Sequence, residues 1–267
     1  MILANHGIVS SSGASFDADA LAFITAASLT DNTQKTAINT LVTDLKTYNI
    51  WTKMKAIYPF VGGTATSHKF NLKDARDLDA AYRLVFNGGW THSSTGALPN
   101  GTTAYGNTNF IPTIDYSVNN NAHISFYSRT NSSEAQFNEM GCYQANYLVI
   151  SLRRSDQSQN SFLFANTNNG INFFDSDSLG LYVANRINNQ ANGFKNGVSK
   201  GSNTVADNAR NNLAVIIGAN NSSNNNVTQY SKRECAFASI GDGLTDTEAS
   251  NFYTAVQAFQ TTLSRNI

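Results

Sequence analysis

The sequence is poor in cysteine, proline and charge. Its 267 residues include two cysteines, three prolines, 18 basic and 18 acidic residues. Cys142 and Cys235 lie far apart and form no C-x-x-C pair, so the chain offers neither a disulfide framework nor a cysteine zinc cluster. We expect both to be buried thiols that pack as small apolar side chains.

The balance of charge excludes several classes of partner. The formal net charge at pH 7 is zero, so no field of one sign is available to hold nucleic acid or an anionic membrane. No apolar run approaches the roughly 20 residues of a membrane helix. Residues 1–7 lack the basic and apolar regions of a secretion signal. We therefore expect a protein that is made in the cytoplasm without a signal peptide, does not insert into membranes and does not bind nucleic acid.

Polarity comes instead from neutral side chains. Charged residues make up 13% of the chain, about half the usual share, whereas asparagine alone occurs 36 times. With 16 phenylalanines and 11 tyrosines, the chain is too aromatic to be disordered. The composition indicates a folded, turn-rich domain whose surface is hydrated through amides and hydroxyls.

Three segments have the pattern of amphipathic helices. Apolar residues recur at spacings of three and four over residues 15–27, 31–48 and 245–263. Thr245 and Glu248 form a capping-box pattern at the start of the third segment. The first two helices are too short to form a core alone, so we expect them to pack on the rest of the chain.

From residue 51 onward the pattern changes to short runs of β-branched and aromatic residues between Asn/Gly/Ser clusters. Asn-Gly pairs, which accept positive φ, predict turns at 87–89, 100–101, 169–170, 192–193 and 196–197. Ten runs at turn-rich intervals predict a mainly β fold, an antiparallel β-sandwich. The expected strands span residues 54–59, 82–86, 123–129, 136–140, 147–153, 161–164, 180–187, 193–198, 213–218 and 235–241.

Residues 90–115 show little periodicity, and we expect a long functional loop there. Amides offer both donors and acceptors to sugar hydroxyls, and an aromatic face can cover the apolar side of a pyranose ring. The alternatives are that Trp90 fills the core beside Phe86 and the loop contacts a neighbouring subunit, or that the loop has no partner. The asparagine-rich stretch 220–226 is expected to be an exposed loop tip. The candidate glycan or subunit contacts in the long loop are Trp90, His92, Tyr105, Asn107 and Asn109.

Four segments together resemble a module of virion proteins from tailed phages and prophages of Bacteroidetes, similar to the concanavalin A-like or laminin-G-like sandwich. They are IWTKMKAIYP at 50–59, SHKFNLKD at 67–74, RLVFNGGWTH at 83–92 and IGDGLTD at 240–246.

The resemblance implies a structural protein on the virion surface, as a head fibre, decoration or tail appendage with a lectin-like jelly roll. Other virion proteins would be its partners, and a homo-oligomer, such as a trimer, would contact host surface glycans. No catalytic residue is carried over with it.

These observations divide the chain into three parts. We expect an extended arm over residues 1–14, a helical hairpin that anchors the protein to a neighbour over 15–50, and a lectin-like sandwich over 51–267 that ends in the helix 245–263.

One segment is similar to a catalytic strand. Residues 134–139 (EAQFNE) resemble the E-x-D-x-x-E strand of lectin-like glucanases, in which two carboxylates on one face act as nucleophile and acid. Here Gln136 replaces the central acid, and without a bulge Glu134 and Glu139 face opposite ways. We therefore expect a non-enzymatic protein with ordinary surface carboxylates at both positions. The alternative is a polysaccharide-degrading glycoside hydrolase that uses them.

Candidate metal ligands are sparse. The four histidines lie apart without the spacing of a zinc site. Asp175 and Asp177 could donate oxygens to Ca²⁺, or could form an Asx turn that bonds its own backbone. We expect no cofactor, with Ca²⁺ at this pair as the open alternative.

Overall fold

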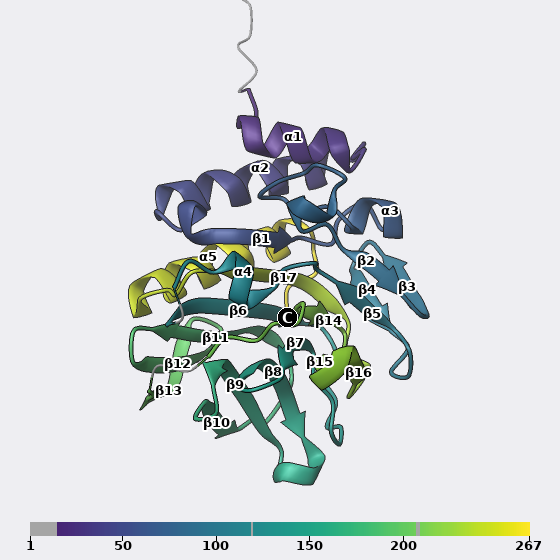
Figure 1. Ribbon diagram of the computed structural model, residues 1–267. Helices are drawn as coiled ribbons and strands as arrows, with labels where there is room; N and C mark the ends of the chain where they lie inside the picture. The colour runs from purple at the N-terminus through teal and green to yellow at the C-terminus, as the bar shows by residue number, and fades with distance from the viewer. Residues whose placement is uncertain (1–14, 119, 207–208) are drawn as a thin grey trace, which may run out of the picture.

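The computed structural model describes residues 15–118, 120–206 and 209–267 (Figure 1), so the expected arm over 1–14 lies outside the described residues. The three longest helices agree with the sequence prediction, and Asp17, Asp31 and Thr245 cap them through their side chains. In the described ranges no helix is both long and apolar enough to cross a membrane. The helices are α1 (Ala18–Ala26), α2 (Asn32–Thr47), α3 (Ala65–His68), α4 (Pro112–Asp115) and α5 (Asp246–Thr262), with short 3-10 turns η1 (Trp51–Lys53), η2 (Asp79–Ala81), η3 (Ser155–Gln157) and η4 (Ser223–Asn225).

The strands form two sheets, which confirms the predicted β-sandwich. The eight-stranded sheet has the order β13-β12-β11-β6-β17-β4-β3, and β1 also pairs with β17. Its strands are β1 (Met54–Tyr58), β3 (Trp90–Ser93), β4 (Gly96–Pro99), β6 (Asn121–Ser128), β11 (Gly180–Ile187), β12 (Gln190–Lys195), β13 (Val198–Thr204) and β17 (Cys235–Gly241).

The nine-stranded sheet has the order β10-β9-β8-β7-β14-β5-β2, with β15 and β16 paired beside β7. The pairing of β15 with β7 is parallel, and the other ladders of both sheets are antiparallel. Its strands are β2 (Val85–Asn87), β5 (Tyr105–Asn107), β7 (Met140–Tyr143), β8 (Tyr147–Arg154), β9 (Asn160–Thr167), β10 (Ile171–Phe174), β14 (Ile216–Ile217), β15 (Asn220–Ser222) and β16 (Asn226–Thr228).

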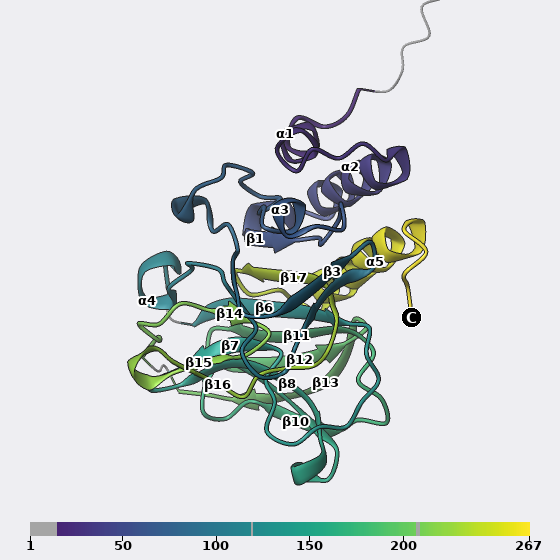
Figure 2. The ribbon, with the colours of Figure 1, turned by 90° about the vertical axis from the view of Figure 1, so that its right-hand side faces the viewer.

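The elements are stacked in layers (Figures 1 and 2). Helices α1, α2 and α5 lie over one face of the eight-stranded sheet, and the nine-stranded sheet lies on its other side. One hydrophobic core fills the space between helices and sheet, and a second fills the space between the sheets. In the part of the chain that the structure describes, no layer of helices covers the outer face of the nine-stranded sheet.

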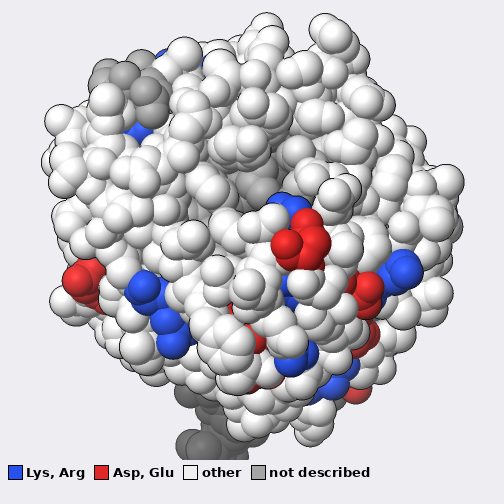
Figure 3. All heavy atoms as spheres, turned by 90° about the horizontal axis from the view of Figure 1, so that it is seen from below, with Lys and Arg blue, Asp and Glu red and all other residues white. Residues whose placement is uncertain are grey.

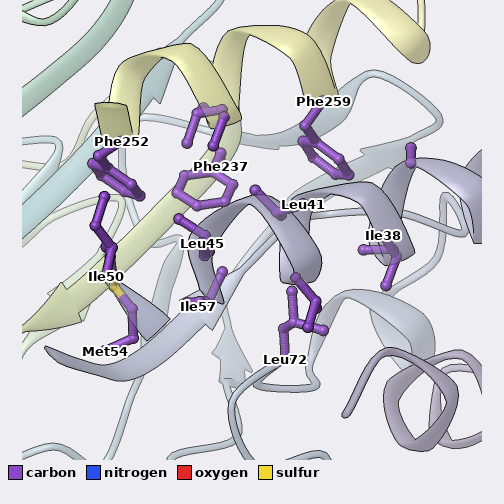
Figure 4. Packing of buried hydrophobic residues seen from close by; sticks show 14 of the residues in the cluster. Ile38, Leu41, Leu45, Ile50, Met54, Ile57, Leu72, Phe237, Phe252 and Phe259 are labelled. Carbon is purple, nitrogen blue, oxygen red and sulfur yellow. The ribbon is translucent and has the colours of Figure 1, made fainter. Parts of the chain in front are cut away.

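The core under the helices makes the N-terminal helices part of the folded body. Leu41 and Leu45 of α2 meet Phe252 and Phe259 of α5 and Phe237 of β17 (Figure 4), and all five are at most 1% exposed. The prediction that these helices pack on the rest of the chain is therefore confirmed. Anchoring of residues 15–50 to a neighbouring protein stays a prediction.

Strand β6 is buried on both faces, although its sequence alternates between polar and apolar residues. The alternation in this strand suggests one wet and one dry face, yet both faces are covered. Phe126 points into the core between the sheets and Tyr127 into the core under the helices. The polar residues are satisfied internally, since His123 and Ser125 both hydrogen-bond the Ser239 hydroxyl, at 3.1 and 2.7 Å.

Several sequence expectations are wrong in the irregular regions. Residues 90–115 are not one long loop, because they contain β3, β4, β5 and α4, whose three or four residues are too few to show a period. The stretch 220–226 is not simply an exposed tip, since Asn220 and Asn221 in β15 are buried. The strand expected over 136–140 begins only at Met140, because Gln136 takes a positive φ of 55°.

The predicted turns fare better. Asn196 and Gly197, with φ values of 51° and 72°, connect β12 to β13 as expected. Asn192 and Gly193, in contrast, lie inside β12 at a β-bulge, and the preceding turn contains Asn188 with a φ of 53°. An Asn-Gly pair therefore marks the expected chain reversal at 196–197, but only a β-bulge at 192–193.

Candidate functional site

A groove of about 550 Å³ lies on the outer face of the nine-stranded sheet. Figure 3 looks onto the molecule from this side and shows a face that is hollowed near its middle and carries few charged side chains around the hollow. The described residues that line the groove are Asn138, Tyr143, Tyr147, Val149, Ser151, Arg154, Gln157, Phe162, Phe164, Asn168, Asn220, Ser222, Thr228 and Gln229.

The alternation of β8 and β9 places these side chains. In β8, Leu148 and Ile150 point into the core between the sheets, so the alternate residues Tyr147 and Val149 line the groove. In β9, Leu163 and Ala165 are core residues, and the phenylalanines that flank Leu163 face outward. Because β8 and β9 are paired, their outward-facing residues form one continuous surface.

Four aromatic rings form a platform along this surface, which we call the aromatic platform: Tyr143, Tyr147, Phe162 and Phe164. The two tyrosine rings stack with centroids 4.1 Å apart and planes 11° apart. Tyr147 lies 5.0 Å from Phe164, whose ring is parallel to that of Phe162 at 6.3 Å. All four are half-buried, so they pack on one another and still present surface to a ligand.

The one charged residue among the described lining residues is Arg154, at the end of β8. Its Nε and Nη2 donate to the two carboxylate oxygens of Asp156, at 3.1 and 2.5 Å. Its guanidinium carbon also lies 5.7 Å from the centre of the Phe162 ring. The hydrogen bonds from Arg154 hold the pKa of Asp156 below its usual value, so the pair stays doubly ionised and neutral in sum.

Three amides lie beside the aromatic platform, and we call them the amide cluster: Asn138, Asn220 and Gln229. The Oε1 of Gln229 accepts hydrogen bonds from the amide nitrogens of Asn138 and Asn220, at 2.5 and 3.5 Å. Within the described residues, the buried Oδ1 of Asn220 has no hydrogen-bond partner. Asn138 and Asn220 are buried and support Gln229, which is partly exposed and is the member of the cluster that a ligand beside the rings can reach.

The combination suits a ligand with apolar faces and neutral polar edges. Half-buried rings can stack on an apolar face, and amides can donate to and accept from hydroxyl groups. Within the described ranges, no group of three or more His, Cys, Asp or Glu side chains is arranged to hold a metal ion.

None of the five loop residues predicted as contacts lines this groove. Trp90 and His92 lie on β3, where the Trp90 ring packs 5.4 Å from Phe86 and its Nε1 donates to the Asn87 carbonyl at 3.1 Å. Trp90 is partly buried and packs beside Phe86, as the alternative expects, while contact of this region with a subunit stays a prediction. His92 also bonds His68 between Nδ1 atoms at 2.9 Å, and burial lowers the pKa of both rings, that of His68 to about 3.

The other three predicted contact residues, Tyr105, Asn107 and Asn109, have structural contacts of their own. Tyr105 and Asn107 belong to β5. The Oδ1 of Asn107 accepts from the backbone N–H of Asn109 at 2.9 Å, and the Asn109 side chain donates to the Arg83 carbonyl at 3.2 Å. Both asparagine side chains shape the local backbone, and contact of this region with a glycan or subunit stays a prediction.

The two glutamates of the strand that resembles a catalytic one have different surroundings. Glu139 is fully buried, with Oε1 2.5 Å from Arg233 and Oε2 accepting from the Leu152 N–H at 2.7 Å. Burial raises the pKa of Glu139, and Arg233 opposes that rise. The expectation of a surface carboxylate is therefore wrong for Glu139, while Glu134 is partly exposed. A carboxylate without solvent access cannot reach a substrate.

The proposed calcium ligands are held by a lysine. The Nζ of Lys195 lies 2.5 Å from Asp175 Oδ1 and 2.8 Å from Asp177 Oδ1. Tyr182 donates its hydroxyl to the other oxygen of Asp175 at 2.7 Å. Asp177 also accepts from the Leu179 N–H at 2.9 Å, which is the Asx turn of the alternative interpretation. An ammonium group thus stands where a cation shared by the two carboxylates would stand.

The sequence did not lead us to predict the aromatic platform, although the spacing of two of its residues points to it. Phe162 and Phe164 are two residues apart in the strand expected over 161–164, so both were placeable on one sheet face. Tyr147 begins the strand expected over 147–153, whereas Tyr143 lies outside the expected strands. The amide cluster has no such signal, because its three members come from distant segments and look like ordinary loop amides.

Comparison with known proteins supports the fold. No family model and no curated protein matches the sequence. A mutant sialidase from Trypanosoma rangeli is similar in structure, with a TM-score of 0.52 and 10% identity over 83% of this chain and 39% of that chain. Its likeness supports the architecture of two mainly antiparallel sheets packed as a β-sandwich.

Two further structures align less well. Domain 4 of AbnA, an extracellular arabinanase from Geobacillus stearothermophilus solved with arabinotriose, covers 75% of this chain and 98% of its own, at 14% identity and a TM-score of 0.46. A structure of botulinum neurotoxin type C, whose cell entry depends on two ganglioside molecules, covers 79% of this chain and 53% of its own, at 12% identity and a TM-score of 0.45.

Proposed function

We propose that this protein is a carbohydrate-binding module that holds glycans in the groove on the nine-stranded sheet. The observation that carries the proposal is the aromatic platform beside the amide cluster, both on one open sheet face. A sugar ring has an apolar face that stacks on an aromatic ring and hydroxyls that pair with amides. The groove volume of about 550 Å³ lies within the usual range for small-molecule sites.

A glycan array with two alanine variants tests this proposal. Tyr147→Ala removes the central ring of the aromatic platform, and we expect an affinity loss of about tenfold or more, because stacking and apolar contact disappear together. Phe174→Ala is the matched control, since Phe174 is a 69% exposed aromatic residue on the same sheet outside the groove. Equal affinity of Tyr147→Ala and wild type, with both proteins folded, would contradict the proposal.

In this proposal the protein binds and does not cleave. The support is the position of Glu139, which is buried against Arg233 and has no route to a bound chain. Purified protein should release no reducing ends from any polysaccharide that it binds. Release by wild type that is lost in Glu134→Gln would instead favour the hydrolase.

The setting we propose is the surface of a tailed-phage particle, as a head fibre, decoration or tail appendage among other virion proteins. Its support is the resemblance of the four sequence segments named above. Several copies in a homo-oligomer such as a trimer would convert weak glycan contacts into useful avidity. Antibody labelling of particles tests the location and solution mass tests the oligomer; unlabelled particles or a monomer would contradict the respective part.

A further inference from the structure

The charge inside the groove is cancelled before any ligand arrives. Arg154 holds both oxygens of Asp156, and the side chains are only 20% and 26% exposed. The 3-10 turn η3 reverses the chain directly after β8 and brings Asp156 back onto the guanidinium two residues earlier. Asp156 also accepts from the Gln136 N–H at 3.4 Å, which fixes the carboxylate from a second side.

The guanidinium is held on its other side as well. The guanidinium carbon lies over the Phe162 ring of the aromatic platform, 5.7 Å from the ring centre. A bidentate pair with carboxylate uses the same donors that would recognise the carboxylate of an acidic sugar. A negatively charged ligand would therefore have to displace Asp156 or lie beside it without compensation.

Resting on the proposed function, we infer that the groove selects uncharged glycans and that Asp156 sets this selectivity by occupying Arg154. Neutral hexose chains contact the rings and the amides, and the Arg154–Asp156 ion pair does not reduce their affinity. Sialylated or uronic acid-containing chains find Nε and Nη2 of Arg154 already bonded to Asp156, so they gain no bidentate charge-assisted pair for the cost of desolvating their own carboxylate. Selectivity then comes from an internal anion that occupies the place of an acidic ligand.

Asp156→Asn tests this inference because it keeps the shape and a hydrogen-bond acceptor for Arg154 while it removes the charge. Wild type and variant are titrated with neutral oligosaccharides and with matched sialylated and uronic acid-containing ones from the same array. We expect wild type to bind neutral chains and Asp156→Asn to gain about tenfold or more for carboxylated chains, because a charge-assisted pair becomes available. The gain should shrink as salt is raised.

Two controls separate this effect from a change in net charge. Asp246→Asn removes one negative charge at the exposed start of α5, on the far side of the eight-stranded sheet, and should leave the glycan preference unchanged. The double variant Arg154→Gln/Asp156→Asn should lose the gained affinity for carboxylated chains.

Each result is decisive for one of the two claims. Wild type that binds carboxylated chains as well as neutral ones overturns the inference and leaves the proposed function standing. An Asp156→Asn variant without any gain overturns the role of Asp156. Folded protein that binds no glycan of either kind overturns the proposed function, and the inference falls with it.

Discussion

The rings of Tyr143 and Tyr147 lie nearly parallel, 4.1 Å apart between their centroids. The two residues face each other directly across the β7–β8 ladder, so strand register holds the stack. Tyr147 is thereby fixed between Tyr143 and Phe164, and its orientation in the groove is set before a ligand binds.

Removing the supporting ring should weaken glycan binding indirectly. In Tyr143→Ala the Tyr147 ring remains but loses its stacking partner, an interaction of about 0.5–1.5 kcal/mol. We expect a loss of affinity of several fold, smaller than that of Tyr147→Ala, by titration calorimetry. Tyr143→Phe keeps the stack and should retain the affinity, and a wild-type value for Tyr143→Ala would show that the stack is irrelevant.

Calcium should stabilise a lysine variant and not the wild type. Lys195 neutralises Asp175, which is 3% exposed, so Lys195→Met leaves a buried carboxylate without its cation. We expect a loss of about 3 kcal/mol in the free energy of unfolding. Because Ca²⁺ takes carboxylate oxygens, millimolar Ca²⁺ should raise the Tm of the variant. A similar rise in wild type would mean that calcium displaces the ammonium.

Breaking the buried pair of Glu139 and Arg233 should destabilise the sandwich. Both side chains are fully buried, so Glu139→Ala leaves the guanidinium without its carboxylate, at a cost of about 3–5 kcal/mol. The double variant Glu139→Leu/Arg233→Met removes both charges and should be more stable than Glu139→Ala. Urea unfolding measures both, and a Glu139→Ala variant as stable as wild type would contradict the structural role.

Acid should destabilise the fold between pH 6.5 and 4 through His123. Burial lowers its pKa to about 4, and its Nδ1 donates to the Asp242 carbonyl at 2.6 Å, so the neutral ring is the folded form. The unfolded chain takes up a proton near pH 6.5, so stability is full above that value and falls by about 3 kcal/mol as the pH drops to 4. The lowered pKa of His68 acts in the same direction.

The measurement is urea unfolding at pH 7, 5.5 and 4.5, in wild type and His123→Gln. Carboxylates with a lowered pKa, such as Asp17, lose their contribution below about pH 4, outside this interval. The variant should show a shallower fall in stability with acidification. Parallel curves for the two proteins would contradict the assignment.

The fold was predictable where periodicity is long or capped. The helix over 246–262 follows from the Thr245 capping box and its apolar stripe, and the strand over 180–187 from eight residues of strand-like composition. Among the short strands between residues 85 and 107, β3 and β4 pair with each other as a hairpin, whereas β2 pairs with β5 beyond that hairpin and β5 also pairs with β14 far along the chain. A run of three residues carries too little pattern to reveal such pairing.

The site was predictable only in its chemistry. The expectation that rings and amides would meet glycans led to Trp90 and its loop, whereas the groove uses the same residue types at Tyr147, Phe164 and Asn220. Which aromatic residues face out depends on strand register and on which sheet face the helices cover. Both are set by packing between distant segments, and neither is visible in local sequence.

A crystal structure with the strongest oligosaccharide from the array tests the central claim most directly. The account predicts a sugar ring stacked on Tyr147 or Phe164, with hydroxyls bonded to the amide cluster. A saccharide bound instead beside Trp90 and Tyr105, with the groove on the nine-stranded sheet empty, would contradict it.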